Sequence, residues 1–136
     1  MKKRRVRPRV MLVLLTLVAL GAWLYQGDLP AEAVDAKYTS PASQFLTLDD
    51  GARIHFRDEG NRTGVPIVLI HGSMASLHTW APWVERLGKT YRIVTLDLPA
   101  HGLTGAVPSG DYSGAAQLRV VQAVTTHLNL DAFVLG

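Results

Sequence analysis

The chain has 136 residues, of which 48% are hydrophobic and 18% charged, and it contains no cysteine. This composition excludes a mostly disordered protein, and the lack of cysteine excludes disulfide bonds, thiolate metal sites and a cysteine nucleophile. Six of the 14 Lys and Arg residues lie within residues 1–9, which leaves 8 basic against 11 acidic residues in the remainder. The formal charge of +3 therefore comes from a basic N-terminal tail, and we expect no nucleic-acid partner.

Residues 10–25 follow the basic tail and carry no charged side chain. A basic run before an apolar run is typical of a membrane anchor, and Trp23 and Tyr25 lie where interfacial aromatic residues are found. A span needs about 17–25 residues, so these 16 are marginal. The sequence predicts a single-pass anchor with the following domain on the non-cytoplasmic side of the membrane. The alternatives are a cleaved signal peptide of a secreted or periplasmic protein, and a buried or interfacial helix.

Residues 26–43 are rich in Ala, Asp, Pro and Gly and show no sustained periodicity, which predicts a linker. The domain is expected over residues 44–136. Its first feature is a predicted β-hairpin, because residues 45–48 and 53–57 alternate between apolar and polar side chains around the turn sequence Asp49-Asp50-Gly51.

The rest of the domain alternates between apolar runs and amphipathic segments. We expect strands over 65–70, 91–96 and 132–135, and helices over 80–87 and 115–128. This order predicts the α/β class, with a mostly parallel sheet and helices on both faces. In such sheets, ligands bind beyond the carboxyl ends of the strands.

Short motifs follow the predicted buried strands. His71-Gly72-Ser73-Met74 follows the first, Asp97-Leu-Pro-Ala-His-Gly102 follows the second, and the third ends at Gly136. In this order and spacing, with Trp80 in the intervening helix, residues 45–136 resemble the N-terminal part of the α/β-hydrolase family. The resemblance implies hydrolysis of an ester or related bond in a small-molecule acyl substrate, by nucleophilic attack and without a cofactor.

The resemblance also implies roles for individual residues. The backbone N–H of Ser73 corresponds to a donor of the oxyanion hole, and Gly72 would allow the chain to turn sharply before it. His71, Gly72, Met74 and Trp80 would line the substrate site, whereas Asp97, His101 and Gly136 would be structural. Alone, His71 could act as a base, Asp97 as an acid or base, and Ser73 as a nucleophile; the resemblance favours the roles given above.

Two features depart from the family pattern. Many relatives have Asp-x-Pro-Gly-x-Gly, whereas this chain has Ala100 in place of the first of these glycines, which would cost about 1 kcal/mol if that position needs a positive φ. The family nucleophile, in G-x-S-x-G or a variant with Asp, follows the strand that ends here at Gly136, and the catalytic acid and base follow the nucleophile. The sequence contains none of these three groups.

The sequence therefore predicts an oxyanion donor and part of a pocket, without nucleophile, acid or base. Three hypotheses stay open: an esterase-like hydrolase in its full-length form, a relative of the dehalogenases and epoxide hydrolases with an Asp nucleophile, and a non-catalytic or truncated member of the fold. The five histidines lack the spacing of a metal site, and no phosphate-binding glycine loop occurs. We expect neither a metal nor a cofactor.

Overall fold

The structure is a computed structural model that describes residues 7–25, 27 and 29–136. The chain divides into two compact units, Met1–Pro30 and Ala31–Gly136. Most of the predicted basic tail, residues 1–6, lies outside the described residues, as do residues 26 and 28 of the predicted linker.

Helix α1 (Pro8–Leu24) is the helix of the first unit. It begins at a proline, which suits the first turn of a helix because the missing N–H would have no helical partner there. Among the helices that the structure describes, none combines the length and apolar character needed to cross a membrane. The predicted transmembrane anchor over 10–25 is therefore not supported: the 17 residues of α1 extend about 26 Å, short of the roughly 30 Å of a hydrocarbon core.

The second unit contains a five-stranded sheet in the order β1-β2-β4-β3-β5. Strand β1 (Ser43–Thr47) pairs antiparallel with β2 (Arg53–Gly60), and β2 pairs antiparallel with β4 (Arg92–Leu96). Strand β3 (Pro66–Ile70) lies parallel to β4 on one side and to β5 (Val134–Leu135) on the other. The predicted hairpin and the predicted α/β class are both confirmed. The sheet is mixed, with two antiparallel and two parallel strand pairings.

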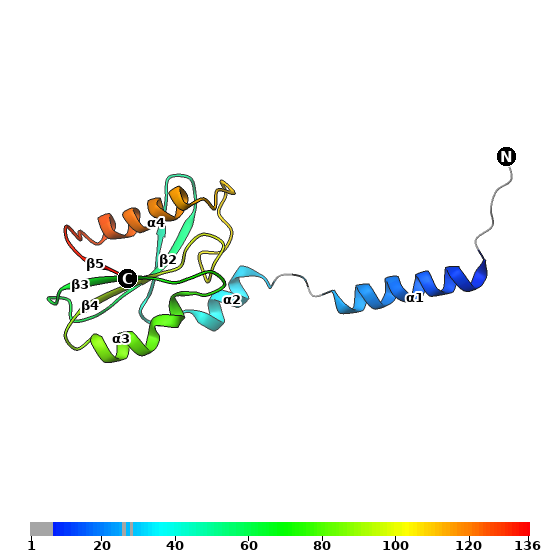
Figure 1. Cartoon of the computed structure of the whole chain (residues 1–136), viewed down its shortest axis with the longest axis horizontal. Helices are drawn as coiled ribbons and strands as arrows, with labels where there is room; N and C mark the ends of the chain where they lie inside the picture. Colours follow the sequence, from blue (N-terminus) through cyan, green and yellow to red (C-terminus); the bar gives the residue numbers. More distant parts are fainter. Residues whose placement is uncertain (1–6, 26, 28) are drawn as a thin grey trace. The chain divides into compact units, whose positions relative to one another are not determined.

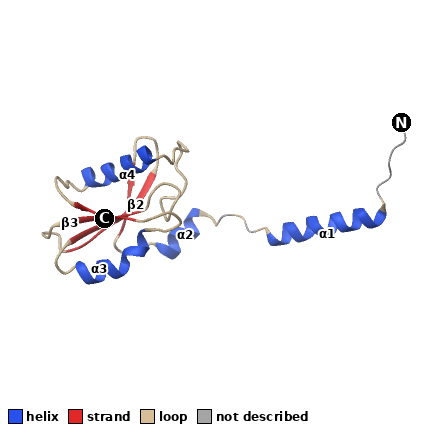
Figure 2. Cartoon of the chain, in the orientation of Figure 1, coloured by secondary structure: helices blue, strands red, loops and turns tan. Residues whose placement is uncertain are grey.

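Helices cover both faces of this sheet, with α4 (Gly114–His127) on one face and α3 (Ala81–Leu87) on the other (Figures 1 and 2). Strand alternation directs apolar side chains toward α4, where they form the hydrophobic core. The core residues are Ala52, Ile54, Phe56, Val68, Val94, Leu96, Leu98, Val107, Val120, Val121 and Val124. The opposite face of β2 and β4 carries His55 and Thr95, which are also buried.

A short 3-10 helix, η1 (Leu77–Trp80), precedes α3, so the helix predicted over 80–87 begins with a tighter turn. Leu77 is 2% exposed and fixes η1 to the sheet.

Helix α2 (Ala31–Tyr38) lies within the segment predicted as a linker. Its composition of Ala, Glu and Lys favours helix, with Glu32 in the first turn and Lys37 in the last. Contacts with β2 hold it in place: Asp35 pairs with Arg53 at 2.8 Å, and Arg57 Nη2 donates to the carbonyl of Tyr38 at 3.4 Å. Eight residues provide too few turns for a visible apolar stripe, so the sequence pattern did not reveal this helix.

Candidate functional site

The loops that carry the predicted site residues lie at the carboxyl ends of neighbouring parallel strands. The His71 loop follows β3, the Asp97 loop follows β4, and Gly136 follows β5. Gly136 continues the pairing of β5 with β3, because its N–H donates to Val68 at 3.0 Å and its carbonyl accepts from Ile70 at 2.8 Å. The topology therefore brings three of the sequence motifs to one edge of the sheet, where α/β proteins bind ligands.

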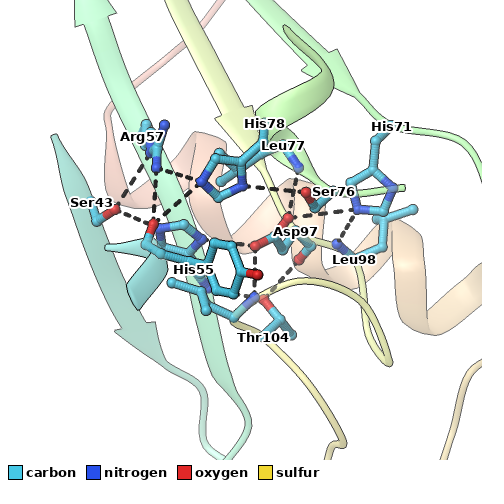
Figure 3. Close-up of polar contacts among 12 residues, drawn as sticks. Ser43, His55, Arg57, His71, Ser76, Leu77, His78, Asp97, Leu98 and Thr104 are labelled. Carbon is cyan, nitrogen blue, oxygen red and sulfur yellow. Dashed lines mark hydrogen bonds and ion pairs between the residues drawn. The ribbon is translucent and has the colours of Figure 1, made fainter. Parts of the chain in front are cut away.

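His71 is 3% exposed and links the loops after β3 and β4 (Figure 3). The N–H of Leu98 donates to His71 Nε2 at 3.1 Å, so Nε2 is unprotonated and the ring proton lies on Nδ1. Nδ1 in turn donates to the carbonyl of Gly72 at 2.8 Å. Both nitrogens of the neutral ring thus bond to the backbone, and neither has a free lone pair with which to act as a general base.

Gly72, Ser73 and Met74 are exposed, and Met74, at 96%, is almost completely so. Within the part of the chain that the structure describes, the N–H of Ser73 has no hydrogen-bond acceptor, so it is free to bind one from a ligand. The sharp turn expected at Gly72 occurs instead at Met74, whose φ is 59°, and a Cβ at Gly72 would meet no atom within 4 Å.

The buried carboxylate of Asp97 holds three elements together (Figure 3). Its Oδ1 accepts from the N–H of Leu77 at 2.7 Å, and its Oδ2 accepts from the N–H of Leu103 at 2.9 Å and from His55 Nδ1 at 2.8 Å. Burial alone raises the pKa of Asp97, but the hydrogen bonds from His55, Leu77 and Leu103 outweigh it, so this pKa lies below its ordinary value. Gly102, at φ +47°, lies so close to the carboxylate that a Cβ there would overlap it.

His55, which bonds to Asp97 through Nδ1, also bonds to a serine through Nε2. The sequence pattern did not predict this series of hydrogen bonds. His55 Nε2 lies 2.8 Å from Ser43 Oγ, so Ser43, His55 and Asp97 form the hydrogen-bond series of a hydrolase triad. Ser43 Oγ, however, also accepts from the N–H of Ser40 at 3.1 Å and from Arg57 Nε at 3.4 Å. Both lone pairs of this hydroxyl are occupied and none is available for attack on a substrate. The series binds β1 to the loops at the sheet edge.

One signal for this series was present in the sequence. Residues 53–57 alternate, so His55 and Arg57 share the face of β2 opposite the apolar core. Identifying their partner requires the strand order, because Asp97 comes next to His55 only when β4 lies beside β2.

The remaining predicted residues lie around this centre. Trp80 is half-buried against Trp83, with ring centroids 6.2 Å apart, so it packs on α3. The ring of His101 lies 5.0 Å from that of His71, and its Nδ1 donates to the carbonyl of Pro99 at 2.8 Å. Ala100 has φ 66°, the positive value that its place in the motif implied. Among the described residues, no three or more His, Asp or Glu side chains are grouped to hold a metal ion.

Comparison with known proteins connects this geometry to a family. The family model for the alpha/beta hydrolase fold matches residues 65–136, which include both loops and β5. The chain belongs to the α/β-hydrolase family. The resemblance to this family seen in the sequence is thus confirmed.

Relatives of this α/β-hydrolase chain act on varied substrates. An (E)-2-((N-methylformamido)methylene)succinate hydrolase from Acinetobacter baylyi is 35% identical over 65 residues, which are 48% of this chain and 24% of that protein. A haloalkane dehalogenase from Psychrobacter cryohalolentis is 28% identical over 97 residues, 67% of this chain and 32% of that protein. A variant of the N-acyl homoserine lactonase AidH, complexed with N-hexanoyl homoserine lactone, superposes with a TM-score of 0.63 at 28% identity, covering 68% of this chain and 35% of that one.

The chain spans about a quarter to a third of the length of the curated relatives it matches. The matching part holds the His71 loop and the Asp97 loop, and the 136-residue sequence contains no G-x-S-x-G motif.

Proposed function

We propose that this chain forms the oxyanion-binding part of a hydrolase active site. In the whole protein, a nucleophile in this site attacks the carbonyl carbon of a small acyl or ester substrate. The observation that carries the proposal is the N–H of Ser73, which has no hydrogen-bond acceptor among the described residues and lies in an exposed loop that His71 holds in place. A fixed N–H stabilises the negative charge that develops on the carbonyl oxygen as the nucleophile attacks, and one such donor contributes about 3–4 kcal/mol.

The neighbouring elements support this role. Gly136 lies at the end of β5, next to β3, so a nucleophile on the following turn would lie beside the Ser73 loop. The structurally similar lactonase is complexed with an acyl compound, N-hexanoyl homoserine lactone, which supports a small acyl substrate. The nucleophile, acid and base are proposed to be outside the sequence of Met1–Gly136.

A proline substitution tests the oxyanion role, because proline has no backbone N–H. In the whole protein that contains this chain, we expect Ser73→Pro to lower kcat for 4-nitrophenyl esters about 100- to 1,000-fold with a smaller effect on KM. The matched variant Ser73→Ala keeps the N–H and should keep kcat within about threefold. Circular dichroism and thermal unfolding check that both variants fold. If Ser73→Ala is inactive, the result indicates that the Ser73 hydroxyl is the nucleophile. If Ser73→Pro is fully active, the backbone N–H of Ser73 has no oxyanion role.

A second candidate reaction is attack by an Asp nucleophile, which the similarity to a haloalkane dehalogenase favours. A fluorophosphonate probe separates the two, because it labels an activated serine and not an aspartate. Labelling that persists in Ser43→Ala supports a serine nucleophile elsewhere in the whole protein. Labelling that Ser43→Ala abolishes would make Ser43 reactive, in conflict with its occupied lone pairs. Halide release from a haloalkane without labelling would identify the Asp mechanism.

A further inference from the structure

A cavity of about 380 Å³ lies between α2 and the two loops at the carboxyl ends of β3 and β4. Its lining residues are Val34, Tyr38, Ser76, His78, Gly102 and Leu103. We infer that this cavity binds a neutral, mainly apolar part of the substrate, namely an acyl chain of medium length. This inference rests on the proposed hydrolase function and adds the substrate class that the site would select.

The walls of the cavity are fixed before any ligand binds. Asp97 accepts from the N–H of Leu77, which lies between Ser76 and His78, and from the N–H of Leu103 in the opposite wall. One buried carboxylate therefore sets the separation of the two loops. Such a preformed cavity, within the usual size range of ligand sites, binds without the cost of ordering its walls.

The chemistry of the walls selects an uncharged group, because none of the described residues that line the cavity is a Lys, Arg, Asp or Glu. The polar atoms of His78 are occupied within the protein: its Nε2 lies 2.9 Å from Arg57 Nη2 and 3.3 Å from the carbonyl oxygen of Tyr38. Nδ1 lies 3.3 Å from Ser76 Oγ, and the two polar side chains satisfy each other (Figure 3). Val34, Leu103 and the ring of Tyr38 provide the remaining, apolar surface, which suits an alkyl chain.

One wall comes from outside the region that the family model matches. Helix α2 contributes Val34 and Tyr38, whereas the match begins at residue 65. Asp35 and the carbonyl of Tyr38 tie this helix to β2, and the Tyr38 ring meets the ring of His78 edge to face at 6.2 Å. The two side chains on α2 are thus specificity-determining residues outside the region that the family model matches.

The first test measures occupancy with a neutral aromatic probe, N-phenyl-1-naphthylamine, whose fluorescence rises in an apolar site. We expect Val34→Trp, which fills the cavity from α2, to weaken probe binding to the chain at least tenfold. The matched variant Ala36→Trp adds the same side chain at an exposed position of α2 that does not line the cavity, and it should leave binding unchanged. Equal binding by the wild-type chain and Val34→Trp would overturn the inference.

The second test compares 4-nitrophenyl hexanoate with 4-nitrophenyl acetate in the whole protein. If the cavity holds the acyl chain, Val34→Trp raises KM for the hexanoate about tenfold and leaves KM for the acetate unchanged. Lost probe binding with an unchanged KM ratio would overturn the assignment to the substrate, because the cavity would then bind a separate neutral ligand. If the whole protein hydrolyses neither ester but Val34→Trp still loses the probe, the proposed function fails and the cavity assignment is restricted to ligand binding.

Discussion

Ala100 occupies a backbone conformation that its side chain disfavours. Its φ of 66° lies in the left-handed region, where a Cβ crowds the following carbonyl. The strain persists because the surrounding loop is held at both ends: the N–H of Ala100 donates to the carbonyl of Gly105 at 2.7 Å, and Asp97 accepts from the N–H of Leu103. The loop thus imposes a conformation at Ala100 that many relatives accommodate with glycine.

We expect Ala100→Gly to stabilise the protein by about 1 kcal/mol, because glycine adopts a positive φ without strain and this gain exceeds its greater loss of chain entropy on folding. Urea unfolding followed by circular dichroism measures the change. The control Ala123→Gly makes the same substitution within helix α4, where it should destabilise by about 0.5–1 kcal/mol. A loss of stability in Ala100→Gly would show that Ala100 is not strained.

At the scale of elements, Asp97 joins β2, η1 and the loop after β4 through hydrogen bonds that require an ionised carboxylate. The side-chain amide of asparagine would point an N–H donor toward the N–H groups from which Asp97 now accepts hydrogen bonds. We therefore expect Asp97→Asn to lower the free energy of unfolding at neutral pH by about 3 kcal/mol. Asp49→Asn, at an exposed position in the β1–β2 turn, is the matched control and should change stability by less than about 0.5 kcal/mol.

The pH dependence of this loss follows from the pKa of Asp97, which is lower in the folded than in the unfolded protein. A carboxylate whose pKa is lowered by folding stabilises the folded protein. This stabilisation is complete above the pKa of the unfolded protein, about 3.9, and it is lost as the pH falls through the pKa of the folded protein. The difference in the free energy of unfolding between the wild type and Asp97→Asn should therefore stay constant above about pH 6 and shrink below about pH 4. A difference that is the same at all pH values would mean that Asp97 is not ionised in the folded protein.

The elements differ in how far the sequence alone could predict them. The β1–β2 hairpin, β3, β4 and α4 carry an alternating, continuous or helical apolar pattern that is strong enough to be read locally. Helix α2 has no such stripe, and it is held by the contacts of Asp35 and Tyr38 with β2. The Ser43–His55–Asp97 series depends on the strand order, which no local pattern encodes. The loops of the site were therefore predictable, whereas their hydrogen-bonded support was not.

At the scale of the whole molecule, the sheet has an apolar edge at β5. In the 136-residue chain, β5 pairs only with β3 among the described strands, and Val134 and Leu135 are 55% and 58% exposed. Exposed apolar edge strands pair with other chains. We expect the chain Met1–Gly136 to self-associate through this edge at micromolar concentration.

Light scattering after size-exclusion chromatography tests this association, with a non-ionic detergent present to cover the exposed apolar side chains of α1. Leu135→Lys should shift the chain toward the monomer, because edge lysines oppose strand pairing. Leu118→Lys places the same charge on α4 at a position of nearly equal exposure, 56%, and should leave the association unchanged. Identical behaviour of the two variants would exclude the β5 edge as the interface.

The exposed thioether of Met74 gives the site a sensitivity to oxidants. At 96% exposure it can react with peroxide without any opening of the fold. The sulfoxide that forms is polar and accepts hydrogen bonds, and it would lie one residue along the chain from the free N–H of Ser73. Methionine sulfoxide reductases reverse this modification. The exposed side chain of Met74, at a residue with φ 59°, thus makes the loop after β3 responsive to the redox state of its surroundings.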